Sequence, residues 1–353
     1  MSAPVSSAQA PIVVTGGAGF IGANLADRLA SDGEHVLVFD TLARPGVERN
    51  VAWLKRRHHG RIAFRRADIR DLNACAEAVC GATAVFHFAA QVAVTTSLEN
   101  PVEDFAVNVC GAIGLLEILR RRSPRTPLIF ASTNKVYGDL AEVPLRLSDE
   151  AYRPVDASLA ANGVNETQKL DFHTPYGCSK GAADQYVLDY ARCFGLRTSV
   201  LRMSCIYGPR QMGTEDQGWI AHVLRRVFSG EAITIHGDGR QVRDALYVDD
   251  AVSAYAAALT RIDDIAGCVF NLGGGPANAV SLRDVIACAE NLFQRPARLV
   301  FEPWRAGDQR WYVSDARRAR DALALADPLP WRDGLARLAD WIAAEAPQAR
   351  AEA

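Results

Sequence analysis

Short apolar runs alternate with amphipathic stretches through the first two-thirds of the chain. Each apolar run ends near a polar or glycine-containing turn, which is the rhythm of βαβ units on a parallel sheet. The strands that this pattern predicts are 11–16, 35–40, 61–68, 83–90, 127–132 and 198–204. The clearest helices are predicted at 20–31, 101–122 and 176–194. The fold class is therefore α/β, with a doubly wound parallel sheet.

The pattern becomes less regular beyond about residue 205, where a glycine-rich hairpin signal, IHGDGRQVRD, occupies 235–244. Late helices are predicted at 281–293 and 331–345, and Ser281 with Asp284 forms a weak capping box for the first of them. We expect a Rossmann sheet domain with a smaller, mixed C-terminal substrate domain. The predicted boundaries are 1–10 for a flexible tail, 11–205 with 245–275 for the Rossmann domain, 206–244 with 276–346 for the substrate domain, and 347–353 for a second tail.

Composition excludes several classes of protein. Of 353 residues, 49% are apolar and 23% charged, and no run of eighteen apolar residues suggests a membrane span. A net charge of -2 gives no general attraction for nucleic acid. The eight cysteines form no C-x-x-C pair, so we predict neither a metal site nor a disulfide framework. The first ten residues lack the features of a secretory signal, and we expect a cytoplasmic protein.

The sequence TGGAGFIG follows the first predicted strand and opens the first predicted helix. Its spacing, G-x-x-G-x-x-G, lets the backbone and the helix N-terminus approach a pyrophosphate. Asp40 ends the second predicted strand, where a carboxylate accepts from both ribose hydroxyls and repels a 2′-phosphate. We therefore predict bound NAD, although Arg44 nearby leaves NADP open. The predicted contacts in this part of the chain are Gly16, Gly19, Phe20, Ile21, Gly22, Asp40 and Arg44.

Further cofactor contacts are expected at the ends of the next strands. Asp68 can bind the adenine amino group, or it can be an ordinary cap at the end of a strand. Small residues after the fourth strand leave room for a dinucleotide, and Gln91 can reach either the cofactor or a sugar. The contacts predicted here are Asp68, Ile69, Ala89, Ala90, Gln91 and Asn108. His87, in the same apolar run, is better explained as a core histidine than as a catalyst.

Tyr176 and Lys180, in YGCSK, stand four residues apart on a predicted helix and so point the same way. A phenol with a pKa of about 10 is a poor base near neutrality and needs a nearby cation. We expect Lys180 and an oxidised nicotinamide ring to lower this pKa together, and we expect both residues also to contact the cofactor. Thr133, at the end of the fifth strand, can share the proton of a substrate alcohol with Tyr176. Redox chemistry on a bound dinucleotide is the reaction class that these residues indicate.

Asn134 and Lys135 follow Thr133 directly. Elimination of water from an oxidised sugar needs a general acid and a general base beside the reacting carbon. Neither of these two residues is a carboxylic acid, so the sequence argues against dehydration.

Together, TGGAGFIG, FHFAAQ, STNKVYGD and YGCSK resemble the extended short-chain dehydrogenase/reductase family of nucleotide-sugar enzymes over nearly the whole chain. The longer strings LDFHTPYGCSKGAADQY and YGPRQMGTEDQGW resemble the branch that inverts C2 of CDP-linked deoxyhexoses. The resemblance implies that Thr133, Tyr176 and Lys180 are catalytic. It also implies that Arg243 holds the substrate pyrophosphate, and that Arg305 and Asp308 lie near its phosphate and ribose. The substrate contacts expected in all are Gln91, Thr133, Asn134, Cys205, Arg243, Arg305 and Asp308.

Cys205 departs from the pattern of the family's 4-epimerases, which carry Asn at the matching position. Cys178 is predicted to be structural, and His173 stays a minor candidate for proton transfer. The favoured function is NAD-dependent C2 epimerisation of a CDP-linked deoxyhexose, by a homo-oligomer that is a dimer or larger. The alternatives are a UDP-sugar 4-epimerase, a 4,6-dehydratase and, more remotely, a non-catalytic dinucleotide sensor.

Overall fold

The computed structural model describes residues 10–148, 151–305 and 307–351, with side chains as far as residue 345. Its largest element is a seven-stranded sheet in the order β3-β2-β1-β4-β5-β8-β12, in which every neighbouring pair is parallel. The strands are β1 (Ile12–Thr15), β2 (Val36–Asp40), β3 (Ile62–Arg66), β4 (Ala84–His87), β5 (Leu128–Thr133), β8 (Thr198–Met203) and β12 (Val269–Leu272). The predicted doubly wound Rossmann sheet is confirmed.

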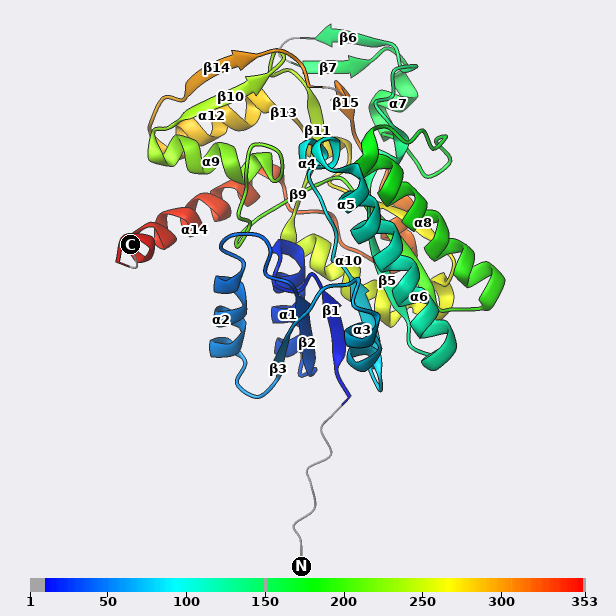
Figure 1. The fold of residues 1–353 in the computed structure, drawn as a ribbon. Coiled ribbons are helices and arrows are strands. Elements are labelled where there is room, and N and C mark those ends of the chain that lie inside the picture. The colour runs from blue at the N-terminus through cyan, green and yellow to red at the C-terminus, as the bar shows by residue number, and fades with distance from the viewer. Residues whose placement is uncertain (1–9, 149–150, 306, 352–353) are drawn as a thin grey trace, which may run out of the picture.

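Helices cover both faces of this sheet (Figure 1). Alternation along β1 shows why: Ile12 and Val14 belong to one apolar core, and Val13 belongs to the other. The helices of the first face are α1 (Phe20–Ser31), α2 (Glu48–Arg57) and α10 (Val248–Thr260). Those of the second face are α3 (Leu72–Val79), α6 (Gly111–Arg122) and α8 (Thr174–Phe194).

The helix predicted over 101–122 is interrupted. The structure has α5 (Pro101–Phe105), a π-helical turn η1 (Ala106–Cys110) and then α6. A π turn holds one extra residue, and such turns often occur at functional sites. Apolar periodicity did not reveal it because its cause is polar: Asn108, inside the turn, is buried and hydrogen-bonded to other segments.

A smaller C-terminal domain lies beyond the carboxyl ends of the parallel strands, in the upper part of Figure 1. Its mixed sheet places β11 (Val242–Tyr247) between the antiparallel β13 (Ala279–Ser281) and the parallel β15 (Trp311–Tyr312), and β11 also pairs with β9 (Cys205–Tyr207). The two remaining pairs are β10 (Ala232–His236) with β14 (Arg298–Glu302), and β6 (Leu145–Ser148) with β7 (Ala151–Pro154).

The hairpin predicted over 235–244 is wrong. β10 pairs with β14 and β11 pairs with β13, β15 and β9, so the glycine-rich turn connects two different sheets. Gly237 has a positive φ of 85°, and a Cβ on it would lie 2.4 Å from the indole of Trp304. The glycine is therefore required by packing against a remote aromatic ring, which a local turn signal does not reveal.

The last helices pack around this domain. The capping box of Ser281 and Asp284 is confirmed at the start of α12. The final helix continues to Ala351. The first predicted tail falls on residues 1–9, and the end of the second falls on 352–353, which lie outside the described residues. The helices and turns not yet named are α4 (Val94–Glu99), η2 (Asn134–Tyr137), α7 (Ala157–Asn162), α9 (Trp219–Ser229), α11 (Ile262–Ile265), η3 (Pro276–Asn278), α12 (Leu282–Phe293), α13 (Arg317–Leu323) and α14 (Trp331–Ala351).

Candidate active site

The glycine turn between β1 and α1 is built by close backbone contacts. Gly16 has φ +68°, and a Cβ there would lie 2.6 Å from the backbone nitrogen of Ala89. A Cβ on Gly22 would lie 2.4 Å from the carbonyl oxygen of Gly16. Gly19 caps α1 without a side-chain hydrogen bond, which leaves the helix's first N–H groups for an anion. The turn is therefore a cradle that fits a pyrophosphate. Phe20 and Ile21 form the first turn of α1 behind it.

Asp40 closes one side of this cradle from the end of β2. Its carboxylate accepts from the backbone N–H of Ala18 at 3.0 Å and of Leu42 at 2.8 Å. Burial raises the pKa of Asp40, and the backbone hydrogen bonds oppose that rise. Arg44 is exposed and hydrogen-bonds Gln217, a residue of the C-terminal domain. Asp40 thus lies where a ribose of the dinucleotide is expected, and Arg44 lies at the edge.

The structure brings most of the other predicted cofactor residues to the same strand ends. Asp68 forms an ion pair with Arg70 at 2.7 Å, and this pairing holds the pKa of Asp68 below its usual range. Ile69 is buried in the core, so its side chain supports the turn. Ala89 donates its backbone N–H to Thr15, and its neighbour Ala90 is also half-buried.

Gln91 and Asn108 form a double clamp. The backbone N–H of Gln91 donates to Asn108 Oδ1 at 2.9 Å, and Asn108 Nδ2 donates to the Gln91 carbonyl at 3.0 Å. Asn108 Nδ2 also contacts Asp104 and Ser179, so its amide is engaged with protein groups. Gln91 Oε1, in contrast, is buried and without a hydrogen-bond partner among the described residues. A buried acceptor without a donor fits a site that a ligand completes.

Thr133 and Tyr176 meet above the end of β5. Thr133 is the last residue of that strand, and Tyr176 lies in the first turn of α8, where Ser97 accepts its backbone N–H at 3.2 Å. Burial raises the pKa of Tyr176 to about 12, whereas a hydrogen bond with Thr133 lowers it. The direction differs from our expectation, because among the protein's own groups desolvation of the phenolate is the larger effect.

Lys180 lies one helical turn after Tyr176 and is buried. Its ammonium donates to the Ala131 carbonyl at 2.6 Å and lies 4.2 Å from the centroid of the Phe130 ring. Burial lowers the pKa of Lys180 to about 8, against the opposing charges of Asp184 and Asp104. Lys180 is therefore anchored beneath the site and still mostly charged at neutral pH.

His87 lies in the core. Thr15 Oγ1 is hydrogen-bonded to its Nδ1 at 2.6 Å, and burial, with the charge of Lys180 second, lowers the pKa of His87 to about 3. A buried, neutral imidazole that is hydrogen-bonded to a neighbouring hydroxyl has a structural role.

A buried ion pair that the sequence did not predict lies beneath the predicted catalytic residues. Arg202 on β8 donates two hydrogen bonds of 2.9 Å to the carboxylate of Asp184, and Ser132 donates to the same carboxylate at 2.7 Å. Both ionic side chains are almost fully buried, at 3% and 0% exposure. The pair links α8, β5 and β8. In the sequence, the sign of this pair is that Asp184 stands one helical turn after Lys180. Its partner, Arg202, could not be predicted because the order of strands in the sheet brings it there.

The turn after Thr133 carries Asn134 and Lys135. Asn134 Nδ2 donates to the buried Gln309 at 3.1 Å, and Gln309 in turn donates to the Gly138 carbonyl at 2.6 Å. Lys135 Nζ donates to the carbonyl of Gly307 at 3.2 Å. The turn is therefore tied to the loop that follows β14, and no local signal in the chain had pointed to Gln309.

Arg243 and Cys205 face this turn from the C-terminal domain. Cys205 pairs with Ala245 in the register of β9 and β11, which sets it beside Arg243 two residues away. The indole N–H of Trp219 lies 3.3 Å from Cys205 Sγ, and burial raises the pKa of the thiol. Cys205 is thus a neutral lining residue. The charges of Arg243 and Asp308 both act on Lys135, so each of these two side chains lies near it.

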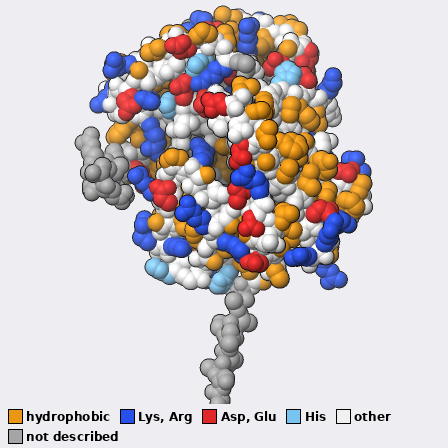
Figure 2. Space-filling model, in the orientation of Figure 1, with side chains coloured by type: hydrophobic (Ala, Val, Ile, Leu, Met, Phe, Trp, Pro, Cys, Tyr) orange, Lys and Arg blue, Asp and Glu red, His pale blue; other side chains and the backbone are white. Residues whose placement is uncertain are grey.

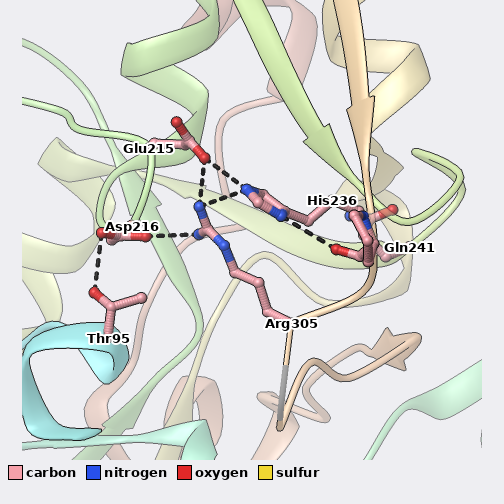
Figure 3. A network of polar contacts seen from close by, with 7 residues as sticks. Thr95, Glu215, Asp216, His236, Gln241 and Arg305 are labelled. Carbon is pink, nitrogen blue, oxygen red and sulfur yellow. Dashed lines mark hydrogen bonds and ion pairs between the residues drawn. The ribbon is translucent and has the colours of Figure 1, made fainter. Parts of the chain in front are cut away.

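Arg305 takes part in a polar network that crosses the site (Figure 3). Its guanidinium pairs with Glu215, and with Asp216 at 2.7 Å. His236 Nε2 contacts the same Glu215 oxygen at 2.6 Å, and Thr95 on α4 donates to Asp216 at 2.9 Å. Burial raises the pKa of Glu215, but His236 and Arg305 outweigh it, so the net shift is downward. The predicted nucleotide-binding arginine is therefore held by two carboxylates.

Two minor candidates lie at the margin. His173 caps α8 and contacts Asp171 at 3.1 Å and Asp139 at 3.5 Å, with 39% of its side chain exposed. Cys178 is exposed, and its thiol lies 3.7 Å from the Phe172 carbonyl. Neither contact connects these residues to Tyr176.

The site as a whole lies where the two domains meet. Figure 2 shows a hollow between them, with acidic and basic side chains at its rim. Among the described residues, no cluster of three or more histidine, cysteine or acidic side chains could hold a metal ion. Within the same part of the chain, no helix is long and apolar enough to cross a membrane.

Comparisons with known proteins agree with this arrangement. Residues 12–273 match the model of the NAD dependent epimerase/dehydratase family. The chain is 40% identical to CDP-paratose 2-epimerase of Salmonella typhi, over 94% of this chain and 98% of that protein. The crystal structure of Thermus thermophilus UDP-glucose 4-epimerase in complex with NAD is similar, with a TM-score of 0.80, 30% identity, and coverage of 94% and 99%. That of Bacillus cereus UDP-glucuronic acid 4-epimerase, with UDP-glucuronic acid and NAD, has a TM-score of 0.81, 27% identity, and coverage of 95% and 99%.

Proposed function

The chain belongs to the NAD-dependent epimerase/dehydratase family of nucleotide-sugar enzymes, and from this premise we propose that it inverts C2 of a CDP-linked deoxyhexose. The observation that carries the reaction class is the meeting of Thr133 and Tyr176 beside the glycine cradle. The choice of C2 and of cytidine rests on the similarity to the Salmonella enzyme.

The protein's own groups have distinct tasks in this proposal. Tyr176 takes the proton of the C2 hydroxyl, and Thr133 shares that proton through its hydroxyl. Because burial raises the pKa of Tyr176 to about 12, a positive charge must reach the site before the phenolate forms. Bound NAD would supply that charge in its oxidised form, and would accept the C2 hydride and return it to the opposite face of the keto sugar. Lys180 lies beneath Tyr176, where its ammonium donates to the Ala131 carbonyl.

Substrate binding falls to the C-terminal domain. A keto sugar that presents both faces must turn, so the nucleotide has to be held firmly and the hexose loosely. We assign Arg243, Arg305 and Asp308 to the nucleotide diphosphate, since guanidinium groups suit phosphate oxygens. Asn134 is tied to Gln309, which supports a role in shaping the hexose pocket.

The test compares wild-type protein with Tyr176→Phe on a panel of CDP-, UDP- and dTDP-sugars in deuterated water. We expect inversion at C2 without solvent deuterium at carbon, and a loss of about 10²–10⁴-fold in turnover for Tyr176→Phe with NAD still bound. The matched control is Tyr186→Phe on the exposed face of the same helix, which should leave turnover unchanged. Inversion at C4, loss of water, or deuterium at C2 would replace the proposal with one of its rivals. Wild-type protein that holds NAD but turns over no sugar of the panel would indicate a non-catalytic dinucleotide sensor. Turnover unchanged in Tyr176→Phe would show that Tyr176 is not the base.

We also propose that the chain forms a dimer through α5 and α8. Large apolar side chains gather on this side of the molecule, to the right of the hollow in Figure 2. Val102 is 77% exposed and Phe105 53%, and Phe194 on α8 is 50% exposed. Exposed apolar patches of this kind often mark a surface that another protein subunit covers. Light scattering of Phe105→Glu against wild type decides this: a dimer that persists in the variant contradicts it. A cytoplasmic location stays a prediction.

A further inference from the structure

Lys135 occupies a position between the two domains that the reaction described above does not use. It follows Thr133 by two residues in the turn η2, and its backbone N–H donates to the Thr133 hydroxyl at 3.2 Å. Its side chain extends toward the C-terminal domain, where Nζ donates to the Gly307 carbonyl at 3.2 Å. Lys135 thus connects the turn after β5 with the loop that follows β14.

The ammonium of Lys135 retains hydrogen-bonding capacity. It carries three donors. Within the described part of the chain, the Gly307 carbonyl is the acceptor that lies within hydrogen-bonding distance of it. Two N–H directions therefore remain for a ligand. A half-buried cation is costly unless such donors find acceptors.

The charges around Lys135 favour an anion in the space it faces. Burial and then the charge of Arg243 lower the pKa of Lys135 to about 8, while Asp308, Cys205 and Asp139 act in the opposite direction. Lys135 and Arg243 carry like charges and repel each other. An anion between two like charges removes this repulsion and satisfies both sets of donors.

The distance between the sugar-linked phosphate and the reacting carbon differs between C2 and C4 enzymes. In a nucleotide sugar the phosphate is bonded to C1, C2 is adjacent to C1, and C4 lies across the ring. An enzyme that reacts at C2 must therefore bring this phosphate closer to its catalytic hydroxyls than one that reacts at C4. Lys135 is two residues from Thr133, and its backbone N–H donates to the Thr133 hydroxyl. A cation on this turn is therefore suited to hold that phosphate.

We propose that Lys135, together with Arg243, binds the sugar-linked phosphate of the substrate and so presents C2 rather than C4 to Tyr176. The inference rests on the proposed function for its account of C2, but the phosphate contact can be tested separately. Lys135 is on this view a specificity-determining residue, and the Gly307 contact orients its side chain.

The experiment measures binding of CDP and CMP by calorimetry to NAD-loaded wild type, Lys135→Met, Lys135→Arg and the control Lys169→Met. CDP carries the second phosphate and CMP lacks it. We expect Lys135→Met to weaken CDP binding by about tenfold or more and CMP binding by less than about threefold, because a charge-assisted contact is lost. Lys135→Arg should restore much of the loss. Lys169 is exposed, so its variant should match wild type.

A purely structural role predicts a different result. If Lys135 only clamps the Gly307 loop, Lys135→Met weakens CDP and CMP equally, and this outcome overturns the proposal. Unchanged CDP binding overturns it as well. If Lys135→Met weakens CDP binding more than CMP binding, but wild type inverts no CDP-hexose at C2, the phosphate contact stands and the proposed function fails. If Lys135→Met binds CDP weakly yet keeps the wild-type rate and position of inversion at saturation, the account of C2 selection fails.

Discussion

The Rossmann domain and the C-terminal domain hold their polar groups in opposite ways. Beneath the predicted catalytic residues, Asp184 and Arg202 form a pair that is almost completely buried. Across the site, Arg305 pairs with Glu215 and Asp216 while about a third of each side chain stays exposed, at 27%, 35% and 35%. The first arrangement has no access to water, whereas the second can exchange its partners.

The contrast separates the rigid part of the molecule from the part that adapts. A buried, fully bonded pair fixes the strands and the helix that carry Thr133, Tyr176 and Lys180. Half-exposed ion pairs are worth little and break readily when a phosphate competes for the guanidinium. The positions of Thr133, Tyr176 and Lys180 are therefore set by the core, whereas the proposed nucleotide-binding groups can rearrange. Four measurements test this contrast.

The largest effect is expected from Asp184→Asn. The substitution leaves Arg202 buried without a counter-charge, which typically costs about 3–5 kcal/mol. Urea unfolding should show a fall of this size in the free energy of unfolding. The control is Asp263→Asn, whose carboxylate pairs with Arg197 but is 80% exposed, and it should cost less than about 1 kcal/mol. Similar losses in the two variants would remove the distinction between buried and exposed pairs.

Gly16→Ala should follow. The new Cβ would lie 2.6 Å from the Ala89 nitrogen, and the alanine would also have to adopt a positive φ. We expect a loss of about 2–4 kcal/mol, and NAD lost on purification. Gly81 has φ +74° with nothing within 4 Å of its Cβ position, so Gly81→Ala isolates the conformational cost at about 1–2 kcal/mol. NAD retained at wild-type levels in Gly16→Ala would contradict the cradle.

Acid should destabilise the protein through His87. Its pKa is about 3 in the folded state and about 6.5 when unfolded, so the unfolded chain binds the extra proton between these values. The stabilisation is complete above pH 6.5 and is lost as the pH falls, by about 1.4 kcal/mol for each pH unit. His87→Gln should flatten the pH dependence of unfolding over this window, and exposed His59→Gln should not. Equal slopes in His87→Gln and wild type would show that His87 is not the cause.

Glu215→Gln should give the smallest effect. It removes one of the two carboxylates that hold Arg305, so the guanidinium is more available to a nucleotide diphosphate. Since a half-exposed pair is worth about 1 kcal/mol or less, CDP should bind about two- to fivefold more tightly. Glu231→Gln, which breaks the exposed pair with Arg226, is the control. Weaker CDP binding in Glu215→Gln would mean that Glu215 positions Arg305 instead of competing for it.

Much of the Rossmann domain could be predicted because its signals are local. Apolar runs located the first six strands of the large sheet to within a few residues, and α1 matched its prediction over 20–31. The predicted helix over 101–122 concealed a π turn, since the cause lies in the contacts of Asn108 with segments remote in sequence. The predicted hairpin failed for a similar reason, because Gly237 makes room for Trp304 from another part of the chain.

The order of strands and helices, the glycine turn, the acid at the end of β2, and the spacing of Tyr176 and Lys180 could all be read along the chain. These features depend on periodicity and on residues close together in sequence. Three others required the folded protein: the pairing of Arg202 with Asp184, the hold of two carboxylates on Arg305, and the approach of Lys135 to Arg243. These contacts join segments that the sheet order and the packing of the two domains bring together, and no local pattern records them.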